Sequence, residues 1–153
     1  MKKKSSKVSE PEIVIYQKSK LTPEKILNLD TSGLNNPLNR IEFYRSGLTK
    51  SSFESFKTTS GLDYLSLAKV LGVSAKTLQR KQFFDTAQSE RLYQLADFYA
   101  VGINYFGEEG FRKWMERPLF TLDHHIPINL IDSSEGIELL KTEILRLQHG
   151  IAV

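Results

Sequence analysis

The sequence predicts an all-α fold, and three observations lead to this prediction. Apolar residues recur at helical spacing from about residue 35 to the C-terminal end of the chain. The segments with this spacing begin at Ser, Thr, Asp or Asn and end at Gly, which are the residue types that cap helices. No segment longer than four residues alternates strictly between apolar and polar side chains, as a half-buried strand would.

The N-terminal third is predicted to hold an arm and two helices. Residues 1–20 surround one short apolar run with Lys, Ser and Glu, so we expect a flexible basic arm that could add non-specific phosphate contacts. Thr22-Pro23 predicts a short helix, because Pro is favoured in the first turn. Asn36-Pro37 predicts a second helix that ends at Gly47. The predicted apolar faces of this helix and of the next one are Leu38, Ile41 and Tyr44 with Phe43 beside them, then Phe53 and Phe56.

Residues 63–81 have the pattern of a helix-turn-helix. Two short apolar segments flank Gly72, which can adopt the positive φ of a tight turn between helices. Small Ala68 lets the second helix approach closely, and Ser74 is expected to be its N-cap. The predicted inward-facing residues are Leu67, Ala68, Leu71, Val73 and Leu78.

The outward face of the second helix is predicted to bind DNA. Between Ser74 and Phe84 there is no acidic residue, so this face can approach phosphates without repulsion. Side chains of these types also read base edges in the major groove. Lys81 stands where many helix-turn-helix proteins have an apolar residue, which predicts that the helix ends early or lifts slightly from the core. The candidate DNA contacts are Ser74, Lys76, Thr77, Gln79, Arg80 and Lys81.

An ordinary αα-hairpin with a basic face is the alternative interpretation of this segment. A glycine turn alone would favour it. Here five features have the spacing of a helix-turn-helix: a small residue, a glycine, an apolar residue after it, a serine cap and an inward leucine. Their joint agreement favours contact with DNA.

The C-terminal half is predicted to contain three further helices. Asp85 with Gln88 forms a capping box at the start of a long core helix that ends at Gly107. A short amphipathic helix is predicted over residues 110–115, and a final helix over about 135–149. Their predicted apolar faces are Leu92, Leu95, Ala96, Tyr99, Ile103 and Phe106, then Trp114, then Ile137, Leu140, Ile144 and Leu147.

Leu139 and Leu145 widen the apolar surface of the final helix beyond its main stripe. Two interpretations stay open. Either these residues pack deeper inside the protomer, or they form part of an interface with a second copy or another protein.

Composition excludes several classes of protein. The chain has 153 residues, a net charge of +3 and no cysteine, which fits a reducing compartment and excludes disulfides, cysteine-ligated zinc and thiol catalysis. No apolar run approaches the length of a transmembrane helix. The basic start is not followed by an apolar stretch, so we expect no secretory signal and a cytoplasmic location.

No pattern of catalytic or metal-binding residues emerges from the sequence. Asp123, His124 and His125 are adjacent, so their side chains diverge in most backbone conformations, and a metal site is not expected there. Glu108-Glu109 is explained by its place near a helix start, where acidic groups are favourable. There is no nucleophile with an activating base and no carboxylate pair set around a pocket, so we expect neither an enzyme nor a bound cofactor.

Short motifs occur in a specific order between about Arg40 and Gly150. They are Gly47-Leu48 with Phe53, Leu71-Gly72-Val73-Ser74 with Thr77-Leu78-Gln79-Arg80, Ser89-Glu90-Arg91-Leu92, Phe106-Gly107, Trp114-Met115, Pro127-Ile128 with Leu130-Ile131, Ser133 and Gly136, and Leu145-Arg146-Leu147 with Gly150. In this order they resemble the antitoxins grouped as MbcA/ParS/Xre, which pair with RES-domain toxins. The resemblance covers roughly three quarters of the chain.

The resemblance implies two binding functions and no catalysis. A DNA-binding domain at 21–84 would bind the promoter of the chain's own operon, and a C-terminal domain at 85–153 would cover the active site of an NAD-consuming RES toxin. A homodimer or a larger complex with the toxin is implied. The implied toxin contacts are Leu122, Asp123, His124, His125, Pro127, His149 and Ile151.

Two positions depart from the pattern of this family. Asp123-His124-His125 replaces its usual Gly-rich stretch, and Ser133 stands where Thr is common. A stand-alone transcription regulator, whose C-terminal half only dimerises, is the alternative function.

Overall fold

The computed structural model describes residues 20–30 and 33–150, and these form eight α-helices and two short 3-10 helices. No β-strand occurs within these ranges, which confirms the predicted all-α fold. Residues 1–19 of the predicted arm lie outside the described part. The elements are α1 (Pro23–Ile26), α2 (Pro37–Ser46), α3 (Lys50–Ser60), α4 (Tyr64–Leu71), α5 (Ala75–Arg80), α6 (Thr86–Phe106), α7 (Glu108–Glu116), η1 (Phe120–Leu122), η2 (Pro127–Leu130) and α8 (Ser134–Gln148).

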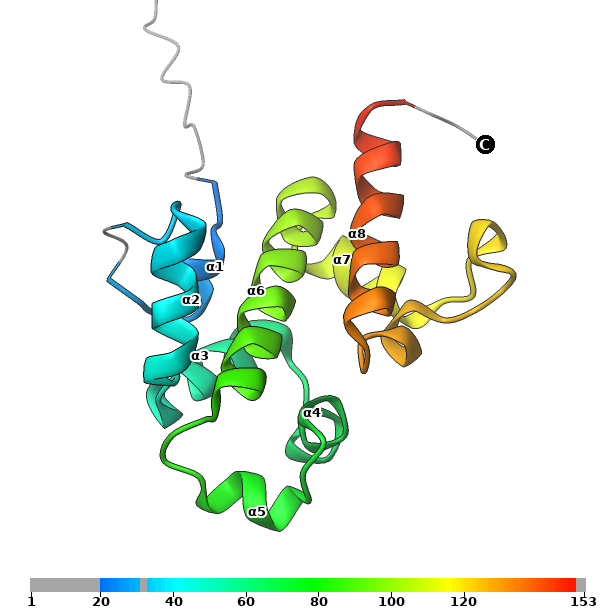
Figure 1. The fold of residues 1–153 in the computed structure, drawn as a ribbon. Coiled ribbons are helices and arrows are strands. Elements are labelled where there is room, and N and C mark those ends of the chain that lie inside the picture. Colours follow the sequence, from blue (N-terminus) through cyan, green and yellow to red (C-terminus); the bar gives the residue numbers. More distant parts are fainter. Residues whose placement is uncertain (1–19, 31–32, 151–153) are drawn as a thin grey trace, which may run out of the picture.

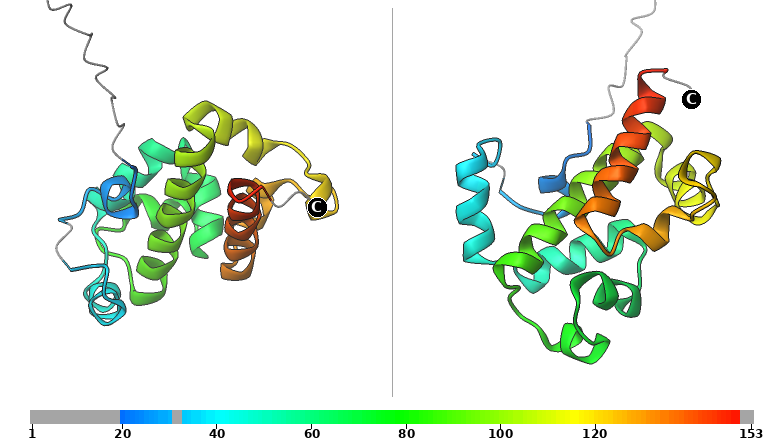
Figure 2. Two further views of the ribbon diagram at one scale, coloured as in Figure 1. Left: turned by 90° about the horizontal axis from the view of Figure 1, so that it is seen from above. Right: turned by 45° about the vertical axis from the view of Figure 1, so that its right-hand side comes forward.

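Helix α6 is the centre of the molecule. It packs against α1, α2, α3, α4, α7 and α8, and seen from above it lies between α1 and α2 on one side and α8 on the other (Figures 1 and 2). A helix surrounded in this way must be apolar on more than one face. Its buried residues include Leu92, Leu95, Ala96, Phe98, Tyr99, Ala100 and Gly102.

Both predicted ends of α6 are confirmed. The Asp85 carboxylate accepts from the Gln88 amide at 2.8 Å, and the Gln88 side chain accepts from the Asp85 amide at 3.2 Å. Gly107, with φ +77°, ends the helix. The Gly107 carbonyl then accepts from the Phe111 amide at 2.9 Å, so α7 begins at Glu108, two residues before the predicted start at 110.

The short helix α1 is tied to α6 by polar side chains. The Tyr93 hydroxyl donates to Glu24 at 2.6 Å, and Asn104 exchanges two hydrogen bonds with the backbone of Leu21 at 2.8 and 2.9 Å. Burial raises the pKa of Tyr93, which therefore stays protonated and able to donate. Residues 21–29 thus form a fixed part of the fold.

Helix α2 has the predicted bounds, but Leu38 and Ile41 of its predicted apolar face are not in the core. Leu38 is 70% exposed, Ile41 is also exposed, and no residue of α2 is buried. The helix instead contacts α6 through the rings of Phe43 and Tyr44, which pack against Tyr93 with centroids 6.4 and 5.7 Å apart. These two aromatic side chains offer more contact area, and they set the side of α2 that faces the protein.

Helix α8 is buried along only part of its predicted stripe. Ile137, Leu140 and Ile144 are in the core, whereas Leu147 is 40% exposed, contrary to the prediction. Leu139 and Leu145 are exposed as well, so they do not pack deeper inside the protomer. Leu147 lies in the last turn of the helix, near its C-terminal end.

Gly102 gives the first testable prediction, because the Phe111 ring of α7 packs directly against it. A β-carbon at this position would lie 2.2 Å from the Phe111 ring. We expect Gly102→Ala to lower the free energy of unfolding by about 1–3 kcal/mol through overpacking. The measurement is urea denaturation, with Glu90→Ala at an exposed position of the same helix as the control, expected within about 0.5 kcal/mol of the unmodified protein. Equal effects of the two substitutions would contradict the prediction.

Candidate nucleic-acid interface and apolar groove

Helices α4 and α5 form the predicted helix-turn-helix. The Asp63 carboxylate caps α4 by accepting from the Ser66 amide at 2.8 Å. Gly72 has φ +69°, and the Val73 amide donates to the Ala68 carbonyl at 3.0 Å, which closes the turn. Ser74 then caps α5, since its hydroxyl oxygen accepts from the Thr77 amide at 3.1 Å. The prediction of this motif from local spacing is confirmed.

The inward residues of the motif also lie as predicted. Leu67, Ala68, Leu71 and Leu78 are buried, and Val73 packs against them from a partly buried position. Leu78 is the only buried residue of α5, and Ala75 packs against the core from a partly buried position. The rest of its surface faces outward.

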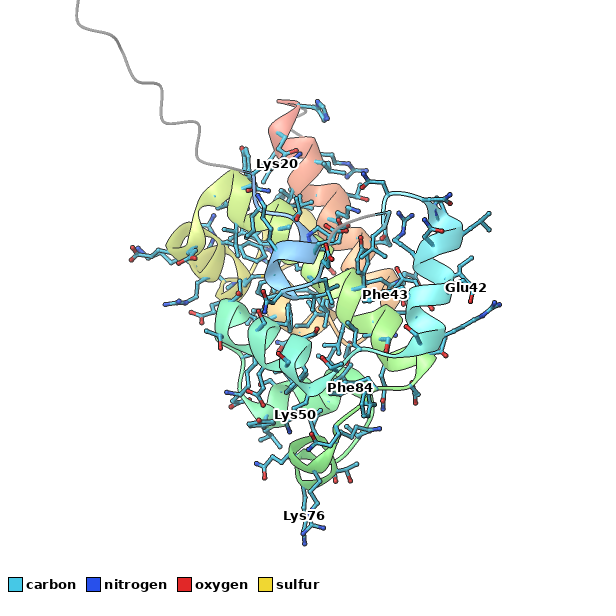
Figure 3. The ribbon with its side chains drawn as sticks, turned by 90° about the vertical axis from the view of Figure 1, so that its left-hand side faces the viewer. Lys20, Glu42, Phe43, Lys50, Lys76 and Phe84 are labelled. Carbon is cyan, nitrogen blue, oxygen red and sulfur yellow. The ribbon has the colours of Figure 1, made fainter. Side chains whose placement is uncertain are left out.

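The outward face of α5 lies at one end of the molecule. Lys76 marks this tip, below Lys50 and Phe84 (Figure 3). The side chains of Lys76, Thr77, Gln79 and Arg80 are exposed. The Ser74 hydroxyl also donates to the Thr77 hydroxyl at 2.8 Å, so it is engaged in the cap. Five of the six candidate contacts predicted from the sequence are therefore brought together on one accessible, basic surface, and the sixth, Lys81, is partly buried.

Lys81 confirms the prediction that the helix ends early. Helix α5 ends at Arg80, and Lys81 is extended, with φ −64° and ψ 134°. Its ammonium group lies 5.9 Å from the centre of the Phe84 ring. The chain after α5 is held by a short bridge, in which the Lys50 amide donates to the Gln82 carbonyl at 2.9 Å. The sequence pattern gave no indication of this bridge.

The loop after α7 is closed by its own backbone. The Leu119 amide donates to the His125 carbonyl at 3.1 Å, and the His124 amide donates to the Leu119 carbonyl at 2.9 Å. Asp123 and His124 have φ of +50° and +61°, in the left-handed region. His125 Nδ1 lies 2.8 Å from the Leu122 carbonyl oxygen. Within the described ranges, no group of three His, Asp or Glu side chains is placed to hold a metal ion.

The candidate toxin contacts differ in their exposure. Leu122 and Pro127 are buried, so in the free protomer they hold the loop rather than present a surface. Asp123, His124 and His125 are exposed, and so is His149 at the end of α8. Ile151 lies outside the described residues.

An apolar groove lies beside this loop. Phe120 lies at the edge of the groove and is 82% exposed. Its ring packs against that of His124, with ring centroids 5.7 Å apart. Trp114 is buried at its base and stacks on Phe106, with ring centres 5.5 Å apart. The residues that line the groove are Tyr105, Phe106, Trp114, Arg117, Leu119, Phe120, Thr121, Glu143 and Leu147. Sequence reasoning missed the groove, because its residues come from four separate elements.

Comparisons with known families match both of these regions. Residues 40–97 match the antitoxin Xre-like helix-turn-helix domain, and residues 102–150 match the antitoxin Xre/MbcA/ParS C-terminal toxin-binding domain. The chain belongs to the Xre/MbcA/ParS antitoxin family. The resemblance predicted from the motifs is thereby confirmed. No curated protein matches the antitoxin at a significant level.

Family membership assigns a function to each of the two matched domains. The antitoxin has a helix-turn-helix domain that binds DNA and a second domain that binds a toxin, and these two families are not typically enzymes. The groove lies entirely within the toxin-binding domain. Helix α6 contributes residues to both domains. No helix in the described part of the antitoxin is long and apolar enough to cross a membrane.

His124 gives the second prediction. Its φ of +61° lies in the left-handed region, a conformation that costs a non-glycine residue about 1–2 kcal/mol. His124→Gly should raise the free energy of unfolding by about 0.5–1 kcal/mol, since the entropy of glycine in the unfolded chain offsets part of the relief. His124→Ala keeps the β-carbon and should give no such gain. Urea denaturation measures both variants, and an equal gain from Ala would show that strain is not the cause.

Proposed function

We propose that the antitoxin neutralises a RES-domain toxin by covering its active site, and that it represses its own operon through α5. The observation that carries this proposal is the separation of the two exposed surfaces. In Figure 1, α5 lies at the bottom of the molecule and the η1 loop lies at its right-hand side. A protein with this arrangement can hold toxin and DNA at the same time. In this proposal it acts in the cytoplasm, as a homodimer or in a larger complex with the toxin.

In this proposal α5 lies in the major groove of the operator. Arg80 and Gln79 have side chains that can form paired hydrogen bonds with guanine and adenine, respectively. Lys76, Thr77 and Lys81 would contact phosphates, and Ser74 would orient the first turn of the helix next to the DNA backbone. Because no acidic side chain lies between Ser74 and Phe84, contact with phosphates meets no local repulsion.

The third prediction concerns Arg80. Replacement by Ala should weaken binding to the antitoxin's own promoter by about 1–3 kcal/mol and relax specificity at one base pair. Lys113→Ala on α7 is the charge-matched control, and it should leave binding unchanged. Fluorescence anisotropy with single-base variants of the promoter measures both effects. A uniform loss across all base variants would assign Arg80 to a phosphate.

If the repressor is a dimer, the promoter must contain two half-sites with a defined spacing. Two recognition helices that read one face of the duplex are separated by about 34 Å or a multiple of it. Footprinting should therefore reveal an inverted repeat with that spacing between half-site centres.

The toxin-facing surface combines the exposed loop with the apolar groove. Exposed apolar side chains beside a polar rim are typical of protein interfaces. Phe120, Tyr105 and Leu147 supply the apolar part, and Asp123, His124, His125 and His149 supply the polar part. Ile151, which follows α8 in the sequence, is the remaining proposed contact. An antitoxin seated through this surface would exclude NAD from the toxin without any chemistry of its own.

Phe120 gives the fourth prediction. Phe120→Asp places a charge at the centre of the proposed contact, and it should weaken toxin binding by about 2 kcal/mol or more, as at an interface hot spot. Leu38→Asp is the control, since Leu38 on α2 is similarly exposed but lies outside the toxin-binding domain. Co-expression with the adjacent RES-domain protein measures growth rescue and co-purification.

The two variants should differ clearly in this assay. We expect Phe120→Asp to lose rescue and co-purification while it still binds DNA, and Leu38→Asp to keep all three. If the unmodified protein neither rescues growth nor co-purifies, the proposed toxin is wrong, and a stand-alone regulator explains the chain better.

A further inference from the structure

The C-terminal end of α5 lacks the left-handed glycine that ends its neighbours. Helices α3 and α4 both end at a glycine in the left-handed conformation, Gly61 with φ +70° and Gly72 with φ +69°. This conformation lets the following amides turn back to the last carbonyls of a helix. After α5 the chain continues through extended Lys81 instead. The Lys81 amide still donates to the Thr77 and Leu78 carbonyls at 3.1 and 3.3 Å, whereas donors to the Gln79 carbonyl, nearer the end of the recognition helix, must come from elsewhere.

Lys50 supplies these donors from another helix. Its ammonium group donates to the Gln79 carbonyl at 2.6 Å and lies 3.4 Å from the Leu78 carbonyl. Its own backbone amide donates to the Gln82 carbonyl just beyond. One residue of α3 thus holds both the last turn of α5 and the segment that follows. A positive charge at this end of a helix is also favourable to the helix dipole.

The Lys50 side chain is itself held in place. It is only 22% exposed, and its ammonium group lies 4.0 Å from the Glu54 carboxylate and 5.6 Å from the centre of the Tyr64 ring. The Tyr64 hydroxyl donates to the same carboxylate, and this hydrogen bond raises the pKa of Tyr64. The ammonium group therefore has a fixed position between α3, α4 and α5.

The position of Lys50 at the start of α3 suggests that its contact with α5 has a function. Lys50 is the first residue of α3, and the first turn of this helix has no acidic residue. A positive charge at a helix N-terminus is unfavourable to that helix. Lys50 therefore slightly destabilises α3, and its favourable interaction lies at the C-terminal end of α5. A local rule broken in this way points to a role beyond the helix itself.

We propose that Lys50 is a positioning residue that caps the recognition helix from α3 and sets its orientation for DNA. Lys50 lies just above the tip of the molecule that Lys76 marks (Figure 3), yet its charge is used inside the protein rather than on a phosphate. The proposal rests on the proposed contact of α5 with DNA. Its effect on the free protein can be measured without DNA.

The first experiment therefore uses amide hydrogen exchange on the full free chain. Lys50→Met removes the donors and keeps the apolar stem, Lys50→Arg keeps donors and charge, and Lys57→Met removes a lysine that also lies over the Tyr64 ring, 4.9 Å away. In Lys50→Met the amides of Leu78 to Lys81 should exchange about tenfold faster or more, as expected for one hydrogen bond to a charged group. Lys50→Arg and Lys57→Met should keep the protection of the unmodified protein.

The second experiment measures binding to a duplex that the unmodified protein selects from a random pool, against an unselected duplex. Lys50→Met should lose about tenfold in affinity for the selected duplex, with the same slope of affinity against salt. Lys76→Met should reduce that slope by about 0.9, the value for one phosphate contact. If the unmodified protein selects no duplex, sequence-specific DNA binding fails, while hydrogen exchange still tests the cap.

Each remaining outcome overturns the proposal. Unchanged exchange in α5 of Lys50→Met shows that the lysine does not hold the helix. A reduced salt slope with unchanged exchange makes Lys50 a phosphate contact. Faster exchange that extends equally through α6 and α8 makes it a residue for overall stability. Faster exchange in Lys57→Met as well assigns the effect to Tyr64 rather than to the cap.

Discussion

The packing of α6 is the constraint on which the other elements depend. Its buried faces are covered by helices from both ends of the chain, so neither domain completes its core without it. The helix begins beside the segment that follows α5 and ends at Gly107, where the toxin-binding domain folds back. Its 21 residues extend over about 30 Å. A rigid helix of this length fixes how far α5 lies from the groove, which keeps the two surfaces apart.

The features that the sequence predicted well are helix caps and turns, which form between residues within about one helical turn of each other. The Ser74 cap, the Asp85 and Gln88 capping box and the Gly72 turn each involve residues at most a few positions apart, and all three are present. The face of α2 was different. Helical spacing finds an apolar stripe, but only the neighbouring Tyr93 decides which side is covered, and that residue is about fifty positions away. For the same reason the groove and the contact of Lys50 with Gln79 have no local signal.

The sequence predicts the candidate DNA-binding surface better than the candidate toxin-binding surface, because the first lies on a regular helix and the second on an irregular loop. Most of the candidate DNA contacts lie on one short helix, so its period alone places Lys76, Gln79 and Arg80 outward. The loop at 119–125 has no period, and its backbone follows from two left-handed residues and the bonds that close it. Spacing therefore could not separate buried Leu122 from exposed His124. The exposure of the Phe120 ring, in the same loop, likewise emerges only from the fold.

A recognition helix of six residues cannot hold its own shape in water, because helices this short lack the bonds to offset their nucleation. Its order must come from outside, through the Ser74 cap at one end, Leu78 beneath and Lys50 at the other end. Order that is present before binding reduces the entropy lost when DNA arrives. If any of the three contacts is removed, the helix must be ordered by the DNA itself. Such a loss lowers affinity most for the duplex whose bases the helix has to meet in register.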